Sequence, residues 1–185
     1  MKVLPYITLL VLISCVSNPV AKRDIYIEAI NWRFSLPYGM TFKDSSFDAN
    51  GKLSKQLSSG DRSLKLFHIR ESSLDGFRVH LRRDTLTDRE WIQWQENDTK
   101  NVFRDIKQLP GMQYVDTKYS KTTIGSAPFM VQFVKYVTDG MQDTAFSYQY
   151  VSRIKGISVT VNIWYSDTLT GRKYLDIFYR SRFGQ

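Results

Sequence analysis

The sequence predicts an α+β fold, in which a mostly antiparallel β-sheet is packed with helices. Segments with alternating apolar and polar side chains lie on both sides of one long helical segment. Short turn signals separate the later strand segments, which favours antiparallel neighbours, and a second helical segment follows the last of them. The 185 residues, 42% of them hydrophobic, suffice for one domain and exclude a disordered or low-complexity chain.

The first strand of the domain is expected around an aromatic and aliphatic alternation. Trp32, Phe34 and Leu36 alternate with polar residues and end at the turn residues Pro37-Tyr38-Gly39. The residues from 43 to 61 are rich in Ser, Asp, Asn and Gly, which predicts a surface loop. The first strand is therefore followed by the longest irregular segment of the domain.

Two further strands are expected over residues 64–69 and 77–83. In the second of these, the odd-numbered side chains from Phe77 to Leu81 are apolar, whereas the even-numbered ones are basic. Successive side chains of a strand point to opposite faces of its sheet. One face of this strand is therefore expected to pack in the core and the other to be cationic.

A long helix is expected to follow. Thr87-Asp88-Arg89-Glu90 has the form of a capping box, in which the Thr and Glu side chains satisfy backbone donors at a helix start. The helix should run from Asp88 to Leu109 and stop at Pro110-Gly111. The segment from Gln95 to Asn101 is wholly polar and interrupts the apolar stripe, so the helix is either divided in two or overhangs the core there.

The second half of the chain predicts a run of strands and a closing helix. The strands are expected over residues 112–120, 127–138, 144–154 and 157–165, and the last has the most regular alternation. Asp167, Thr168 or Thr170 can cap the closing helix. Its predicted apolar stripe consists of Leu175, Phe178 and Tyr179.

The N-terminus carries an apolar run that ends at the only cysteine of the chain. The run from Ile7 to Ile13 is shorter than the roughly 20 residues of a membrane-spanning helix and fits the core of a signal peptide. The sequence Leu12-Ile13-Ser14-Cys15 resembles the lipobox of bacterial lipoproteins. The resemblance implies cleavage between Ser14 and Cys15 and acylation of Cys15, with Leu12 and Ser14 as recognition positions.

These features divide the chain into three parts. Residues 1–14 form the expected signal peptide, residues 15–24 a lipidated tether, and residues 25–185 a single α+β domain. The alternatives are an ordinary secretory signal that happens to contain a cysteine, or a buried structural thiol. Val16 follows the cysteine, which by the sorting rule of enterobacterial lipoproteins implies the outer membrane, with the domain facing the periplasm.

Three stretches of the chain resemble the PsbP-like fold family. They are residues 32–40, which read Trp-Arg-Phe-Ser-Leu-Pro-Tyr-Gly-Met, the helix that leads through Pro110-Gly111 into a strand, and the closing helix with its tail, residues 174–183. The family includes the photosystem extrinsic protein, a Ran-binding nuclear transport factor and small bacterial envelope lipoproteins. The resemblance implies an α/β/α sandwich that binds other proteins and is not an enzyme.

Composition leaves little room for cofactor chemistry. One cysteine and two histidines disfavour a disulfide framework and a Cys-rich zinc site. No phosphate-binding loop or hydrolase motif is present in the sequence, so no catalytic residue and no cofactor are expected. His68 and His80 fall on neighbouring predicted strands and could approach each other, but a half-buried polar pair is favoured over a metal site.

The charge of the chain, +8, is compatible with an anionic partner. One candidate surface is the basic strand, with Arg78, His80, Arg82 and Arg83, and another is the closing helix, with Arg172, Lys173, Arg180 and Arg182. A solvated outward face is favoured over a binding surface for both. The aromatic row Phe146, Tyr148 and Tyr150 is interpreted as sheet core beneath a helix and not as a base-stacking platform, so no nucleic-acid partner is expected.

The function expected from these features is that of a lipid-anchored bacterial cell-envelope protein with a non-enzymatic binding role. Its partners would be the membrane, through the lipid anchor, and a protein or anionic component of the envelope. Two alternatives stay open. One is an immunity or inhibitor lipoprotein against an envelope toxin. The other is a secreted hydrolase, which would require a concave pocket with at least two convergent titratable side chains.

Overall fold

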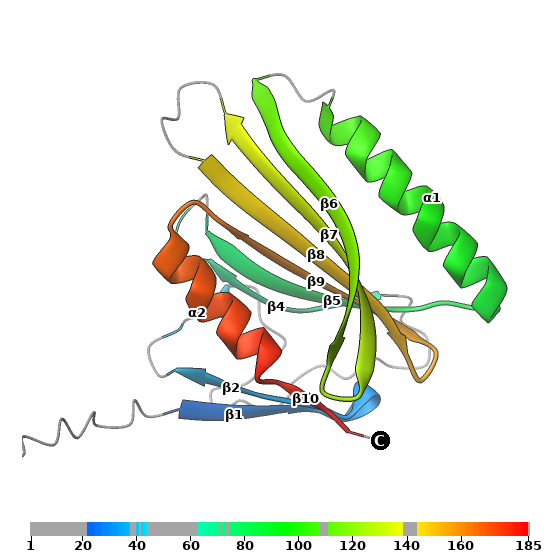
Figure 1. Ribbon diagram of the computed structural model, residues 1–185. Coiled ribbons are helices and arrows are strands. Elements are labelled where there is room, and N and C mark those ends of the chain that lie inside the picture. The colour runs from blue at the N-terminus through cyan, green and yellow to red at the C-terminus, as the bar shows by residue number, and fades with distance from the viewer. Residues whose placement is uncertain are drawn as a thin grey trace, which may run out of the picture.

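The computed structural model describes residues 22–37, 40, 42–43, 63–70, 72, 75–107, 111–138 and 144–184. Within these residues the chain forms a seven-stranded sheet, a three-stranded sheet and two α-helices (Figure 1). All recorded strand pairs are antiparallel. The predicted α+β class with a mostly antiparallel sheet is therefore confirmed. The predicted signal peptide and Cys15 lie outside the described residues.

The larger sheet contains most of the strands that the sequence predicts. Its strands, in spatial order, are β3 (Phe42–Lys43), β4 (Ser63–Arg70), β5 (Gly76–Arg83), β9 (Ile157–Tyr165), β8 (Thr144–Ile154), β7 (Ala127–Thr138) and β6 (Met112–Ile124). The turn between β8 and β9 is formed by Lys155 and Gly156, both with positive φ, as a two-residue hairpin turn requires. The order places β5, β9 and β8 in the centre of the sheet.

Strand β6 is longer than the alternation predicts. Lys121, Thr122 and Thr123 are polar and suggest a turn, but they pair with β7 up to the true turn at Gly125. Gly125 has a φ of 59°, and a Cβ there would lie 2.8 Å from the backbone nitrogen of Phe183. The reversal is thus placed where only glycine leaves room for the C-terminal segment.

The smaller sheet joins the two ends of the domain. It consists of β1 (Lys22–Ile27), β2 (Trp32–Pro37) and β10 (Arg182–Phe183), with the short 3-10 helix η1 (Glu28–Ile30) between the first two strands. Strand β1 begins at Lys22 and so includes the last three residues of the predicted tether, which pair with β2. The sheet lies below the larger sheet in Figure 1.

One apolar core fills the space between the two sheets and helix α2 (Thr168–Tyr179). Trp32 of β2 stacks on Phe183 of β10 at 5.1 Å between ring centroids and meets Phe178 of α2 edge-on at 6.1 Å. The odd-numbered residues of β9 from Ile157 to Ile163 are at most 5% exposed and form the sheet side of this core. The smaller sheet and α2 together cover the apolar face of the larger sheet.

Helix α2 confirms the predicted cap and corrects the predicted stripe. The Asp167 side chain accepts hydrogen bonds from the backbone nitrogens of Leu169 and Thr170, so Asp167 is the N-cap. The buried side chains are Tyr174, Ile177 and Phe178, whereas Leu175 is only partly buried and Tyr179 is 49% exposed. The helix is therefore rotated by about one residue from the predicted orientation.

The aromatic row of β8 lies on the α2 side of the sheet, as predicted. Tyr150 is fully buried and packs edge-on against Phe178 of α2 at 4.8 Å. Its hydroxyl is hydrogen-bonded to that of Tyr179 at 2.9 Å, and burial raises the pKa of Tyr150. Phe146 and Tyr148 are partly buried against the same core. The row is structural and offers no open stacking surface.

Candidate ligand cleft beneath helix α1

The face of the larger sheet that points away from α2 carries many polar side chains in its central strands. In the central strands β5, β9 and β8, the side chains of this face are aligned in cross-strand rows by the register. The first row is Arg78, Asn162 and Gln149, and the second is His80, Thr160 and Val151. Directly paired residues on one face have Cβ atoms about 5 Å apart, so each row is a continuous set of functional groups.

Helix α1 (Asp88–Lys107) crosses this polar face as one continuous helix. The polar segment that interrupts its apolar stripe does not divide it. Gln95 is only 2% exposed, and both Trp94 and Asp98 line a cleft between the helix and the sheet. Residues three and four apart share a helix face, so these three side chains point the same way. The break in the apolar stripe is the part of α1 that stands over the polar rows.

The cleft has a volume of about 430 Å³, which lies in the range of small-molecule sites. It is lined from the sheet by the two polar rows and from α1 by Trp94 and Asp98. Its sides are therefore a guanidinium, an imidazole, a carboxyl group, two amides, a hydroxyl, an indole and the isopropyl group of Val151. Such a lining offers several hydrogen-bond donors and acceptors and one flat aromatic surface.

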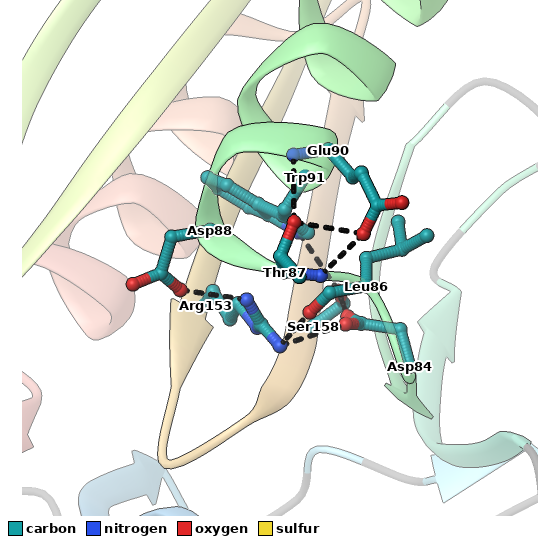
Figure 2. Close-up of polar contacts among 8 residues, drawn as sticks. All are labelled: Asp84, Leu86, Thr87, Asp88, Glu90, Trp91, Arg153 and Ser158. Atoms are coloured by element: carbon teal, nitrogen blue, oxygen red, sulfur yellow. Dashed lines mark hydrogen bonds and ion pairs between the residues drawn. The ribbon is translucent and has the colours of Figure 1, made fainter.

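Polar contacts fix the N-terminal end of α1 in two ways, the first of which is local (Figure 2). The backbone nitrogen and the hydroxyl of Thr87 both donate to the Glu90 carboxylate at 2.7 Å, and the backbone nitrogen of Glu90 donates to the Thr87 hydroxyl at 3.3 Å. This is the predicted capping box. These hydrogen bonds from Thr87 lower the pKa of Glu90.

The second set of contacts joins α1 to the β8–β9 hairpin (Figure 2). Arg153 of β8 forms ion pairs with Asp84 at 3.1 Å and with Asp88 at 2.8 Å, and it donates to the carbonyl oxygen of Leu86 at 2.5 Å. The indole nitrogen of Trp91 donates to the Ser158 hydroxyl at 3.0 Å, and that hydroxyl donates to Asp84. The start of α1 is thereby held on the sheet beside the cleft.

Two titratable groups of the cleft, His80 and Asp98, have pKa values shifted in the direction of their neutral forms. Burial lowers the pKa of His80, and the positive charges of Arg78 and Arg82 lower it further. Burial raises the pKa of Asp98, against the opposing effect of Arg82. The Arg82 guanidinium lies 4.6 Å from the ring centroid of Trp94, a cation–π contact. The cleft thus contains a neutral imidazole beside the cationic Arg78.

One buried polar atom lines the cleft without a partner. Among the residues that the structure describes, the side-chain oxygen of Gln149 has no hydrogen-bond donor. Burying an unsatisfied carbonyl costs about 1–3 kcal/mol, so a donor on a bound molecule would offset that cost. Gln149 lies next to Asn162 in the row that ends at Arg78. An anion held by Arg78 would therefore have amide groups beside it.

The structure separates the four residues of the predicted basic stripe. Arg78 and His80 line the cleft, and Arg82 lies one row further on, against Trp94. Arg83 is exposed, but it does not line the cleft because adjacent residues of a strand point to opposite faces. Helix α1 lies beside this basic face and makes it concave, while the Arg78 side chain remains exposed.

Several lining residues were missed by the sequence analysis. Asn162, Thr160 and Gln149 were not singled out there, and Asp98 was included only as part of a polar gap. One feature of the sequence could have indicated these residues. The helix has a polar gap, and three predicted strands have polar residues on one face. The register that aligns them is a long-range property of the fold.

The two histidines lie beside cationic residues of the neighbouring strand. The register partner of His68 is Arg78 and that of His80 is Lys65, both cationic residues. The His68 ring lies 5.4 Å from the ring of Trp164. In the described part of the chain there is no group of three or more His, Cys, Asp or Glu residues that could hold a metal ion.

Neither of the two α-helices in the described residues is long and apolar enough to cross a bilayer.

Comparison with known proteins bears on the fold. The solution structure of cyanobacterial PsbP (CyanoP) from Synechocystis sp. PCC 6803 matches with a TM-score of 0.54 and 9% identity, over 94% of this chain and 99% of that one. The crystal structure of LpqN of Mycobacterium tuberculosis, described as involved in cell envelope biogenesis, matches with a TM-score of 0.41 and 12% identity, over 90% and 86% of the chains. No family model and no curated protein matches the sequence. The PsbP-like fold expected from the sequence is thus confirmed.

Proposed function

We propose that the chain is a lipid-anchored protein of the bacterial cell envelope whose domain binds an anionic envelope component in the cleft beneath α1, without catalysing a reaction. The main support is the row of Arg78, Asn162 and Gln149 on the floor of a cleft of about 430 Å³. Arginine forms paired hydrogen bonds with carboxylates and phosphates, and the amides beside it would fix the orientation of the ligand.

The remaining lining residues define what else the ligand should contain. His80 is held neutral, so it can accept or donate a hydrogen bond without adding charge. Thr160 and Asn162 add a hydroxyl and an amide, and Trp94 adds an indole. We expect a carboxylate or phosphate group attached to a body with hydroxyl groups, such as an acidic sugar.

The ligand is tested by titrating the full-length protein with glucuronate and with inorganic phosphate, by isothermal calorimetry. Replacing Arg78 by Gln should weaken binding about 10- to 100-fold, because a charge-assisted hydrogen bond is lost. Arg83→Gln is the matched control, since it removes the same charge from the same strand outside the cleft. Equal affinities of the two variants, or no binding of either probe, would contradict the proposal.

The anchor is supported by the sequence Leu12-Ile13-Ser14-Cys15 alone. Two or three acyl chains hold a protein stably on a bilayer, because each buried methylene contributes about 0.8 kcal/mol. Cells grown with radiolabelled palmitate should label the wild-type protein but not Cys15→Ala. Equal labelling of both, or labelling of neither, would rule the anchor out. Val16 favours the outer membrane with the domain facing the periplasm, which fractionation of the two membranes tests.

A hydrolase is the second candidate, because the cleft meets the requirement of two convergent titratable groups. His80 and Asp98 line the same cleft from the sheet and from α1. A neutral imidazole could serve as the base toward a bound water, and the Asp98 carboxyl group, whose pKa burial raises, as the acid. Assays against ester and phosphodiester substrates should then show turnover that His80→Gln abolishes. Turnover that is absent, or unchanged by the substitution, would exclude this candidate.

A further inference from the structure

The outer face of the three-stranded sheet is hydrophilic and lies apart from the cleft. Its strands alternate strictly, so that β2 places Trp32, Phe34 and Leu36 in the core and Arg33 and Ser35 outside. The exposed side chains of the face are Asp24, Tyr26, Arg33, Ser35 and Arg182. None of these side chains packs in the core, so the residues of this face can contribute to binding without a loss of core packing.

Two arginines on this face lie directly opposite each other. Arg33 of β2 and Arg182 of β10 are register partners, and like charges in such a pair are destabilising. Neither forms an ion pair with any residue that the structure describes. The guanidinium of Arg33 lies 4.8 Å from the ring centroid of Tyr26, which holds it over the sheet. An anion between the two guanidiniums would turn a repulsive pair into an attractive site.

The arginines line a shallow groove of about 480 Å³. Arg180 adds a third guanidinium at its edge and is paired with Asp176 at 3.2 Å. Asp24 is the one carboxylate among the lining residues, and it accepts a hydrogen bond from the Ser35 hydroxyl at 2.5 Å. The groove therefore keeps a positive charge and has a hydroxyl and an exposed tyrosine, 44% accessible, beside it.

The short distance along the chain between this face and Cys15 indicates that its partner is a membrane surface. Strand β1 belongs to this sheet and begins at Lys22, seven positions after Cys15. Seven residues span at most about 25 Å when fully extended, so an acylated Cys15 would keep this sheet next to the bilayer. The step rests on the proposed anchor. Anionic headgroups attract arginines near their surface, and tyrosine is enriched at the membrane interface.

We infer that the outer face of the β1–β2–β10 sheet is a docking site for the phosphate headgroups of anionic phospholipids, bound between Arg33 and Arg182. The two guanidiniums donate to the headgroup phosphate, and Tyr26 lies at the level of the headgroups. Docking orients the domain so that the cleft beneath α1, on the opposite side of the larger sheet, faces away from the membrane.

The test uses the full-length protein purified from membranes and reconstituted in vesicles. One set contains phosphatidylcholine alone and the other contains phosphatidylcholine with phosphatidylglycerol. Phenylglyoxal modifies accessible arginines, and mass spectrometry gives the rate at each position. Arg33 and Arg182 should react about fivefold more slowly in the anionic vesicles, the factor expected for one arginine near such a surface. Arg89, exposed at the start of α1, should react equally in both. Equal rates at Arg33 and Arg182 would overturn the inference.

A matched pair of variants separates the site from a general charge effect. In Arg33→Gln/Arg182→Gln, the nearby Arg180 should lose its protection in anionic vesicles. In Arg89→Gln/Lys100→Gln, which removes the same charge from exposed positions on α1, the protection of Arg180 should persist. Loss of protection in both variants, or in neither, would contradict a docking site on this face.

Flotation on the phosphatidylcholine vesicles reports on the anchor separately. Protein that floats with them but shows no protection in anionic vesicles retains the anchor and loses the docking site. Protein that does not float with them but is protected in anionic vesicles loses the anchor and retains the docking site. The two proposals can therefore fail independently.

Discussion

The two faces of the seven-stranded sheet are built from the same strands but differ in what covers them. On the α2 face, β9 places Val159, Val161 and Ile163, each fully buried, in one apolar core. On the α1 face, the intervening Ser158, Thr160 and Asn162 contact polar groups or line the cleft. Both faces carry a helix, and the described contacts of α1 at its N-terminal end are polar, whereas those of α2 are mainly apolar.

The difference shows where the stability and the binding chemistry of the domain are located. Burial of apolar area holds α2 along its length, since its side chains join the common core. Helix α1 is fixed at its N-terminal end by Arg153, Asp84 and Trp91, and its middle stands over polar rows. Substitutions on the apolar face are therefore expected to lower the stability of the fold. Substitutions on the polar face are expected to weaken ligand binding more than stability.

The largest expected effect is the removal of a core ring on the apolar face. Phe178 is fully buried and contacts Trp32, Phe129 and Tyr150, so Phe178→Ala should lower the free energy of unfolding by about 3–5 kcal/mol. Trp94→Ala on α1 should lower the free energy of unfolding by only about 1–2 kcal/mol, because the partly buried Trp94 side chain has less apolar area shielded from water than Phe178 has. Urea unfolding of both variants measures the comparison. Equal losses would mean that the two faces contribute alike.

The second prediction concerns the ion pair at the start of α1. Arg153→Met would leave Asp84, whose side chain is 5% exposed, without its cation, and should lower the free energy of unfolding by about 2–4 kcal/mol. Adding Asp84→Asn should restore part of the loss, because the buried charge is gone. Chemical denaturation of the single and double variants provides the test. A double variant no better than the single one would show that Asp84 is not the cause.

A third, smaller effect is expected from added methyl groups. A Cβ at Gly171 of α2 would meet the ring of Tyr165, which is 8% exposed, so Gly171→Ala should cost about 1–3 kcal/mol through overpacking. A Cβ at Gly76 would meet the ring of Trp164, which is only partly buried. Thermal unfolding should therefore show a smaller loss for Gly76→Ala. The reverse order would contradict the contrast between the faces.

The smallest effect is a pH dependence that arises in the cleft. Burial, aided by Arg78 and Arg82, lowers the pKa of His80 below the value of about 6.5 in an unfolded chain. The unfolded state then binds more protons below pH 6.5, so the free energy of unfolding should fall as the pH drops through that range. His80→Gln should remove this part of the pH dependence. An NMR titration in which the His80 pKa lies above 6.5 would contradict the sign.

Local patterns predicted most of the fold. The regular alternation of residues 157–165 identified β9, and the box formed by Thr87 and Glu90 identified the start of α1. Where local chemistry and tertiary pairing disagree, the prediction was wrong. Thr122 and Thr123 resemble turn residues, yet pairing with β7 keeps them in β6.

The candidate site was less predictable because it depends on register. The basic residues Arg78 and His80 are visible in the sequence, but Asn162 and Gln149 join them only because three distant segments pair in one alignment. The polar gap at Gln95 indicated that α1 is unusual in its middle. A single sequence does not show which strands lie beneath that gap.

The pairing of β2 with β10 affects the order in which the strands of the smaller sheet can form. Trp32 and Phe183 are register partners, and the backbone nitrogen of Gly184 donates to the carbonyl oxygen of Asn31 at 2.8 Å. The smaller sheet therefore stays incomplete until residues 182–184 have joined β2, and its closure needs contacts of high sequence separation, which form slowly. The β1–β2 pair, which is local in sequence, can form first and present the edge on which β10 later docks.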